Sequence, residues 1–326
     1  TALAEVALLR DADLARAREL ADEALAVLAE ASEARFDALR LRGEIAWVPG
    51  DLAEGGRYAG EALEAARALG RKDLEAKAIY ELANTHALRM RYEEAEPLLE
   101  RARQLADESG SITARATAAR AFGAFLRQQG EIDQAEALLS EAAGLFAEAG
   151  IADGEAYALG WLGWSAFVRG DLARAERLFR DVVRILTPLE DRGFLPEGQR
   201  GLAEVLLAQG RVEEAERLAL AARDTVSPWD ITSRASTTMA LGLVRAAQGR
   251  DEEAESLLRE ALALLEPTDF RRVELEPLAA LAEFLVARGR HEEAEPLLAR
   301  LGSALPGAAL GRADAVAAAL RVHASS

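Results

Sequence analysis

Few side chains in this sequence have the types and spacing that chemistry requires. The three histidines, His86, His291 and His323, fall in separate parts of the chain. His291 and Glu295 are four residues apart, as two metal ligands on one helix would be, but no third ligand is evident. Acidic residues beside His291 are also favourable charges at a helix N-terminus. We therefore expect no metal site, no cofactor and no catalytic residue.

The sequence also lacks the other residue patterns that commonly indicate an enzyme. Pairs of glutamates such as Glu93-Glu94 and Glu213-Glu214 recur at one position of a repeating pattern, which is typical of a solvated scaffold face. No Gly-x-x-x-x-Gly-Lys-Ser/Thr loop is present to hold nucleotide phosphates. The chain has no cysteine, which excludes thiolate chemistry and disulfides. We expect that the protein is not an enzyme.

Composition narrows the possible partners. The 326 residues carry a net charge of -17, and nucleic-acid surfaces need a basic face instead. No apolar run approaches the ~18 residues of a membrane span, and no signal peptide is recognisable. Half of the residues are hydrophobic, and alanine and leucine favour helices. These features predict an all-helical cytoplasmic protein that binds neither nucleic acid nor membrane.

The elements that would position any site repeat along the chain. Gly170 and Asp171 predict a turn and a helix N-cap, and apolar residues from Leu172 to Val182 follow at helical spacing. The same pattern returns at intervals of about 40 residues, although its turn glycine is replaced by Met90 in one copy and by Ala12 in a weaker one. The equivalent turn positions are 12, 50, 90, 130, 170, 210, 249 and 289.

A second helix precedes each turn, and before the last seven turns it carries a small residue seven positions ahead of the turn. A small side chain allows two helices to approach closely, so we expect these residues to be buried between the helices of a unit. One copy also has glycines at 55, 56 and 60, which predict a bend or local fraying of its helix. The small residues are Gly43, Ala83, Gly123, Gly163, Ala203, Gly242 and Ala282.

Leu159-x-x-Leu162-Gly163 and Ala175-x-x-x-Phe179 together resemble the signature of the tetratricopeptide repeat (TPR) family. This resemblance implies an α-solenoid, a right-handed superhelix of about eight helix-turn-helix repeats over residues 1–306. Residues 307–326 would form a capping helix or a truncated further repeat. Units of about 40 residues exceed the usual ~34. Such lengthened units resemble C-terminal TPR sensor arrays of bacterial signalling ATPases and transcriptional regulators, and both ends look cut from a larger protein.

In the TPR family the first helix of each unit lines a concave groove, and the resemblance implies which side chains face it. Several are basic although the protein is acidic, and aromatic residues accompany them, as in binding hot spots. Two of them, Arg200 and Glu204, could instead simply pair with each other. The implied groove residues are Arg40, Lys77, Tyr80, Asn84, Arg120, Arg127, Tyr157, Trp164, Arg200 and Glu204.

The family resemblance therefore implies a non-catalytic scaffold or sensor that binds a protein or peptide segment. The excess of groove arginines favours an acidic ligand, selected by Arg120 and Arg200, with Trp164 and Tyr157 receiving its apolar part. The family's carboxylate clamp is matched by Asn84, whereas Tyr80 and Ala121 depart from it. The alternative is a small-molecule sensor with a compact pocket near Tyr157 and Trp164. A peptide site would span three or more units, and a small-molecule site would close around one.

Overall fold

A computed structural model of the chain describes residues 13–30 and 32–304. Within these ranges the chain forms fifteen α-helices and one short 3-10 helix, without any β-strand. The first residues of the array expected over 1–306 and the helix expected within 307–326 lie outside the described residues. None of the described helices combines the length and apolar character that a membrane span requires.

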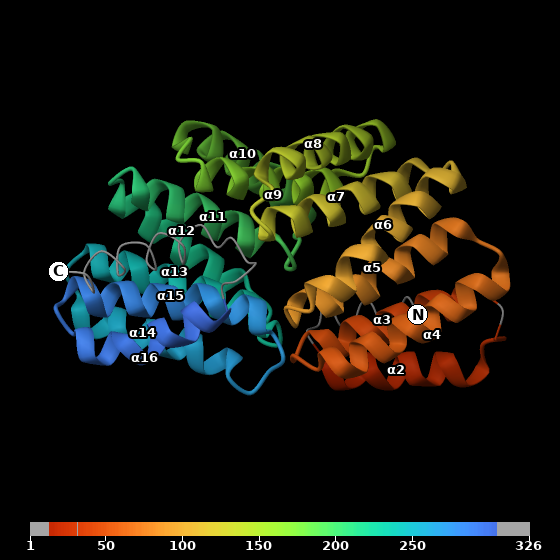
Figure 1. Cartoon of the computed structure of the whole chain (residues 1–326), viewed down its shortest axis with the longest axis horizontal. Coiled ribbons are helices and arrows are strands. Elements are labelled where there is room, and N and C mark those ends of the chain that lie inside the picture. Colours follow the sequence, from red (N-terminus) through yellow and green to blue (C-terminus); the bar gives the residue numbers. More distant parts are fainter. Residues whose placement is uncertain (1–12, 31, 305–326) are drawn as a thin grey trace.

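Successive helices pair antiparallel into units, here called A and B helices, and the units stack into a right-handed α-solenoid. This architecture confirms the expected fold (Figure 1). The helix α2 (Leu14–Val27) precedes seven described pairs. These are α3 (Glu33–Trp47) with α4 (Leu52–Leu69), α5 (Lys72–Leu88) with α6 (Tyr92–Ser109), α7 (Ile112–Gln128) with α8 (Ile132–Ala149), α9 (Ala152–Val168) with α10 (Leu172–Leu186), α11 (Leu195–Ala208) with α12 (Val212–Thr225), α13 (Ile231–Ala247) with α14 (Asp251–Leu265), and α15 (Arg271–Ala287) with α16 (His291–Ala304); the 3-10 helix η1 (Thr187–Leu189) follows α10.

The turn between the A and B helices has the same backbone conformation in successive units. Gly170 adopts a positive φ of 76°, which glycine tolerates without steric penalty. The next residue, Asp171, accepts a hydrogen bond from the backbone N–H of Arg174 at 3.0 Å, so the expected N-cap is confirmed. Met90 keeps the left-handed conformation at φ 61° although it has a side chain. The turn therefore imposes one geometry even where its glycine is lost.

Small residues fill the contact between the helices of a unit, as the sequence predicted. A Cβ atom added to Gly163 on α9 would lie 2.9 Å from the ring of Phe179 on α10. A Cβ atom on Gly123 would lie 2.8 Å from Leu139. Close contacts of this kind leave no room for a larger side chain. All seven predicted residues are buried: Gly43, Ala83, Gly123, Gly163, Ala203, Gly242 and Ala282.

The glycines of α4 do not fray that helix, so the expectation of local fraying is wrong. Helix α4 is continuous from Leu52 to Leu69. Gly55 faces the indole of Trp47, and a Cβ atom there would lie 2.1 Å from the indole Cδ1. Gly56 faces Thr85 of the next unit in the same way, at 3.1 Å. These two glycines accommodate neighbouring side chains and are part of the packed interior.

The two ends of the described array meet across the curve of the superhelix (Figure 1). The backbone N–H of Ile231, at the start of α13, donates a hydrogen bond to the carbonyl oxygen of Val48 at 3.3 Å. Leu52 is buried in one cluster with Phe270, and Arg89 forms an ion pair with Asp269 at 3.0 Å. Contacts therefore extend beyond neighbouring repeats and close the array.

Met90 contributes to this closure. Its side chain packs against a hydrophobic cluster built by α13, α14, α15 and α16, at the opposite end of the array. Glycine at this turn would avoid the left-handed strain of ~1–2 kcal/mol but would have no side chain to make this contact. The departure from the repeat pattern at Met90 is thus explained by packing between distant units.

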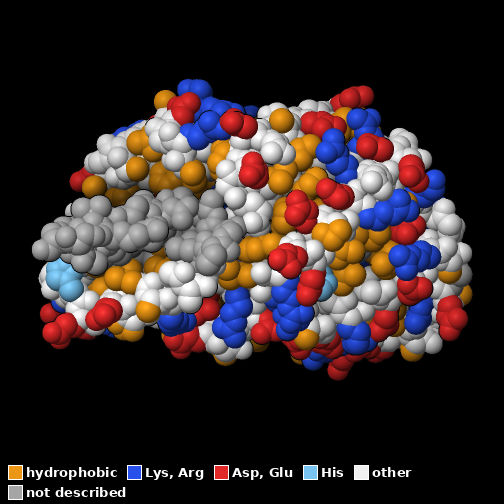
Figure 2. Space-filling view, viewed as in Figure 1, with side chains coloured by type: hydrophobic (Ala, Val, Ile, Leu, Met, Phe, Trp, Pro, Cys, Tyr) orange, Lys and Arg blue, Asp and Glu red, His pale blue; other side chains and the backbone are white. Residues whose placement is uncertain are grey.

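Ion pairs between neighbouring repeats cover much of the outer surface. Arg211 lies 2.8 Å from Glu176 of the preceding unit, and Arg290 lies 2.5 Å from Glu255. Figure 2 shows basic and acidic side chains interspersed over one face, with hydrophobic side chains between them. The net charge of -17 is therefore distributed as pairs with an excess of acid, without a basic patch on this face.

Candidate functional site

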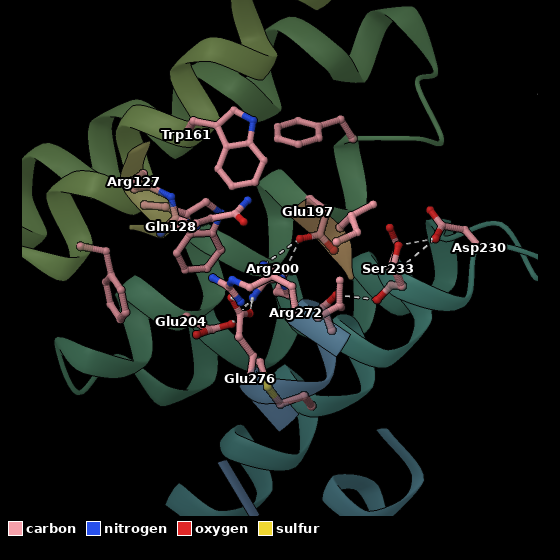
Figure 3. A pocket seen from close by; sticks show the side chains of 18 of the residues that line it. Arg127, Gln128, Trp161, Glu197, Arg200, Glu204, Asp230, Ser233, Arg272 and Glu276 are labelled. Carbon is pink, nitrogen blue, oxygen red and sulfur yellow. Dashed lines mark hydrogen bonds and ion pairs between the residues drawn. The ribbon is translucent and has the colours of Figure 1, made fainter. Parts of the chain in front are cut away.

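A cavity of about 370 Å³, here called the central pocket, lies on the inner face of the superhelix (Figure 3). Six A helices contribute to it: α5, α7, α9, α11, α13 and α15. One side is apolar and aromatic, while arginines and carboxylates from α7, α11 and α15 face it from the others. Its main residues are Arg127, Gln128, Trp161, Trp164, Phe167, Glu197, Arg200, Glu204, Asp230, Ser233, Met239, Arg272 and Glu276.

Arg200 organises the charges on the α11 side of the pocket. It donates hydrogen bonds to Glu197 at 2.9 Å and to Glu204 at 2.7 Å, and its guanidinium lies 4.4 Å from the ring centre of Trp164. Burial alone would lower the pKa of Arg200, but the negative charges of Glu197 and Glu204 raise it above its usual value. Arg200 is therefore satisfied within the protein, in a buried ion-pair network.

Arg127 on α7 is in the opposite situation. Only 9% of its surface is exposed, and it forms no hydrogen bond or ion pair with any residue that the structure describes. Its guanidinium lies 5.1 Å from the ring centre of Trp161. Burial, and then the charge of Arg272, lowers the pKa of Arg127 to about 10. The central pocket therefore contains a desolvated cation without a compensating anion in direct contact.

Arg272 of α15 is a second weakly compensated cation. It is 6% exposed, and its nearest ion-pair partner, Glu276, is 3.9 Å away. Its Nε is buried without a hydrogen-bond partner among the described residues. Arg127 and Arg272 thus line one pocket from α7 and α15, on different sides (Figure 3). The arrangement can attract an anion more readily than it can perform chemistry.

A smaller pocket of about 180 Å³, here called the side pocket, lies on α5 and α7 and is lined by Lys77, Tyr80 and Thr117. Burial, and then the charge of Arg40, lowers the pKa of Lys77. Arg40 itself forms an ion pair with Glu81 at 2.5 Å. The side pocket therefore has a partly buried lysine on the same inner face as the central pocket.

Arg120 and Tyr157 lie on the inner face but do not line either pocket. The guanidinium of Arg120 is 5.8 Å from the ring centre of Tyr80 and 5.9 Å from that of Tyr157. Tyr157 donates a hydrogen bond to Asp191 at 2.9 Å, and burial, with the charge of Asp191, raises its pKa. Its ring packs on Phe194, with 4.5 Å between ring centres. Tyr157 therefore does not line the central pocket itself, whereas Trp164 and Phe194 do.

The structure divides the ten groove residues that the sequence proposed into three groups. Arg127, Trp164, Arg200 and Glu204 line the central pocket. Lys77 and Tyr80 line the side pocket. The remaining four, Arg40, Asn84, Arg120 and Tyr157, line neither of them.

Several residues of the central pocket were missed. Glu197 and Glu276 occupy the repeat position of Lys77 and Tyr157, counted back from the turn, so the repeat register could have found them. Arg272 lies about one helical turn earlier, in the part by which these units exceed the usual repeat length. No cluster of three His, Asp or Glu side chains that could hold a metal occurs in residues 13–30 and 32–304.

Comparison of the sequence with known protein families supports the repeat architecture. The model of the MalT-like TPR region matches residues 109–302, which is more than half of the chain. The chain belongs to the MalT-like TPR family. No curated protein matches this TPR chain significantly.

Solved structures support the same fold. A Rap protein complexed with competence and sporulation factor is 14% identical over 92% of this chain and 82% of its own, with a TM-score of 0.75. The Rap conjugation gene regulator of plasmid pLS20, in complex with the Phr* peptide, is 16% identical over 83% and 73%, with a TM-score of 0.66. BtubC from P. vanneervenii is 20% identical over 65% and 90%, with a TM-score of 0.52. At these identities the likeness shows the fold alone.

Proposed function

We propose that this TPR array is a non-catalytic scaffold that binds a short peptide or protein segment on its inner face. The observation that carries this proposal is the construction of the central pocket from six A helices in six successive units. A peptide site was expected to span at least three units, and a small-molecule site only one. Two Rap structures of similar fold contain a bound factor or peptide, which supports the same type of function.

The size and position of the two pockets suggest how a peptide is held. A volume of about 370 Å³ is at the lower end of the range for ligand pockets, so it encloses only a few side chains. The rest of the segment would run along the inner face past Arg120 toward Lys77 and Tyr80 of the side pocket. In this proposal the array is the sensor part of a larger bacterial cytoplasmic signalling protein.

Selection of peptides from a random library on the immobilised protein tests this function. The selected peptides would be titrated by fluorescence anisotropy against the parent and against Trp164→Ala. Because Trp164 packs on Arg200 and Phe179 at the wall of the pocket, its loss should weaken binding about tenfold or more. Trp229, which is 46% exposed, provides the matched control Trp229→Ala. Peptides that bind parent and Trp164→Ala alike, with the fold intact, would place the site elsewhere.

A small-molecule sensor is the second candidate, and the enclosure of the central pocket favours it. Val48 contacts Ile231 and α5 contacts α15, so residues of distant units surround the pocket, and its volume suits a small ligand. A small ligand would compete with selected peptides only for Arg127 and its neighbours. Binding that is unaffected by changes at Lys77 and Tyr80 favours this second candidate over an extended peptide.

A further inference from the structure

Resting on the peptide-binding function proposed above, we infer that Arg127 is the anchor for a carboxylate of the ligand, with an apolar group of the ligand beside it. The arginine previously expected to select an acid within the central pocket, Arg200, already binds Glu197 and Glu204. Arg120 lacks an ion pair with a described residue but does not line the pocket. Arg127 combines the two properties that a ligand anchor needs: it lines the pocket, and its charge has no ion-pair partner among the described residues.

Burial makes the missing partner of Arg127 significant. A buried charge without a counter-ion is strongly unfavourable, so cations of this kind are normally paired. The neighbouring charges do not compensate for Arg127: Arg272 and Arg200 oppose its ionisation, and Glu276 is the acid that favours it. The face of Trp161 supplies a cation–π contact at 5.1 Å, which is weaker than an ion pair. An anion of the ligand would complete this site.

The other residues of the pocket restrict the anion to a singly charged carboxylate. Glu197, Glu204 and Glu276 also face the cavity, and they would repel a doubly charged phosphate. The planar guanidinium of Arg127 presents paired donors that match the two oxygens of a carboxylate. Arg272 is close enough to lower the pKa of Arg127, so both cations would share the added negative charge.

Apolar residues next to Arg127 define what accompanies the carboxylate. Trp161, Phe167 and Met239 line the same cavity as Arg127. They can receive an aliphatic or aromatic side chain, as aromatic anchors do in binding hot spots. The ligand chemistry is therefore a carboxylate adjacent to an apolar group. Its source is either the free carboxyl terminus of a peptide that ends in an apolar residue, or an internal Asp or Glu beside one.

The test uses the full chain and three matched peptide pools: free carboxyl termini, amidated termini, and free termini without Asp or Glu. Binding is measured by affinity capture and mass spectrometry, followed by titration of the enriched peptides. N-acetylphenylalanine and its amide serve as a small probe pair. The variants are Arg127→Gln, which removes the charge, and Arg115→Gln, which changes an exposed arginine on the same helix.

We expect the parent and Arg115→Gln to bind the carboxylate form about tenfold or more tightly than the matched uncharged form, and Arg127→Gln to lose this preference. If amidation of the terminus abolishes tight binding, the bound carboxylate is the carboxyl terminus of the peptide. If omission of Asp and Glu abolishes it, the bound carboxylate belongs to a side chain. Equal binding of charged and uncharged ligands to the parent, or a preference that survives in Arg127→Gln, overturns the inference. Peptide binding without this preference leaves the proposed function intact.

Two further outcomes separate the inference from the proposed function. If only N-acetylphenylalanine binds, and does so through Arg127, the anchor is supported and the peptide function fails. If neither peptides nor the probe bind, both are overturned. The unfolding temperature gives an independent readout, because removal of an uncompensated buried charge should raise it in ligand-free Arg127→Gln. A lower unfolding temperature in that variant would indicate a structural role and count against the anchor.

Discussion

The backbone N–H of Ile231 donates a hydrogen bond to the carbonyl oxygen of Val48 at 3.3 Å, although the two residues belong to the sixth and first of the seven described helix pairs. Next to this bond, Phe270 packs in a buried cluster with Leu52. A solenoid whose repeats touch only their neighbours would contain no such contacts. The closing contact therefore couples distant units of the described array and helps to shape the pocket between them.

Breaking the closure should change the shape of the protein as well as its stability. Phe270→Ala removes a buried ring and should destabilise the protein by ~3–5 kcal/mol. Phe146→Ala removes an equally buried ring that lies between α8 and its neighbours, away from the closure. Small-angle X-ray scattering should show expansion for Phe270→Ala and not for Phe146→Ala. An unchanged radius of gyration in both variants would argue against a closure held by this cluster.

Gly163→Leu should overpack the contact between α9 and α10. A Cβ atom at Gly163 would already lie 2.9 Å from Phe179, so a larger side chain should cost ~1–3 kcal/mol or more. In an open array this damage would allow the segments on either side of α9 and α10 to unfold separately. Because α5 contacts α15 here, we expect the Gly163→Leu protein to unfold in a single transition. We therefore expect two transitions only when Gly163→Leu is combined with Phe270→Ala.

The control for Gly163→Leu is Gly144→Ala, where an added Cβ atom has no neighbour within 4 Å. This change should stabilise α8 by up to ~1 kcal/mol, because alanine is the better helix former. Calorimetry measures all of these variants. An unchanged unfolding midpoint for Gly163→Leu would contradict the close packing of α9 on α10.

Substitutions at Met90 separate backbone strain from packing. Met90→Ala keeps the left-handed conformation but removes the contact with the distant cluster, so it should destabilise the protein by ~1 kcal/mol or more. Met90→Gly also removes the contact but relieves ~1–2 kcal/mol of strain. We expect Met90→Gly to unfold at higher denaturant concentration than Met90→Ala. If alanine is the more stable of the two, strain at this turn is negligible.

Arg200 should be essential for stability rather than for ligand selection. Arg200→Ala breaks the buried ion pairs with Glu197 and Glu204, which typically costs ~3–5 kcal/mol. Adding Glu197→Gln should recover part of this loss, because it removes the charge of one of the two carboxylates that Arg200 binds. Arg223→Ala, at an exposed arginine of α12, is the control and should be nearly neutral. Denaturant titrations distinguish these outcomes, and a mild effect of Arg200→Ala would contradict the network.

Ion pairs between repeats should make stability depend on acid pH. Hydrogen bonds from Arg180 of the same helix, and from Gln209 and Arg211 of the next unit, lower the pKa of Glu176 from 4.5 to about 2. Arg290 lowers the pKa of Glu255 to about 2. A carboxyl with a lowered folded-state pKa stabilises the fold above its unfolded pKa and loses this contribution as pH falls through the folded pKa. The contribution of each pair, on the order of 1 kcal/mol, should therefore disappear between about pH 4.5 and pH 2.

Glu176→Gln and Glu255→Gln should each reduce the loss of unfolding free energy that occurs as the pH falls from about 4.5 to 2. Glu252→Gln changes an exposed glutamate of α14 that forms no ion pair with a described residue, and it serves as the control. Unfolding free energies measured from pH 2 to pH 7 provide the comparison. Identical slopes in all three variants would show that the inter-repeat pairs do not contribute.

The fold could be predicted from the sequence because each unit repeats the same local requirements. Gly163 and Asp171 are fixed by contacts within one unit, and such contacts recur at regular spacing. The central pocket was only partly predicted, since Arg127 and Trp164 follow the repeat register whereas Arg272 does not. The shape of the central pocket depends on the closure, and no periodic pattern in the sequence predicts which distant units are in contact. Met90 was visible as an exception, but its cause lies at the other end of the chain.

The closure also limits how this chain can change in length over evolution. Open repeat arrays tolerate the gain or loss of whole units, because each unit needs only its immediate neighbours. Here an inserted or deleted unit would carry Phe270 away from Leu52 and leave both apolar surfaces facing water. Relatives that retain the contact should therefore keep the same number of units between these residues and diverge by substitution instead.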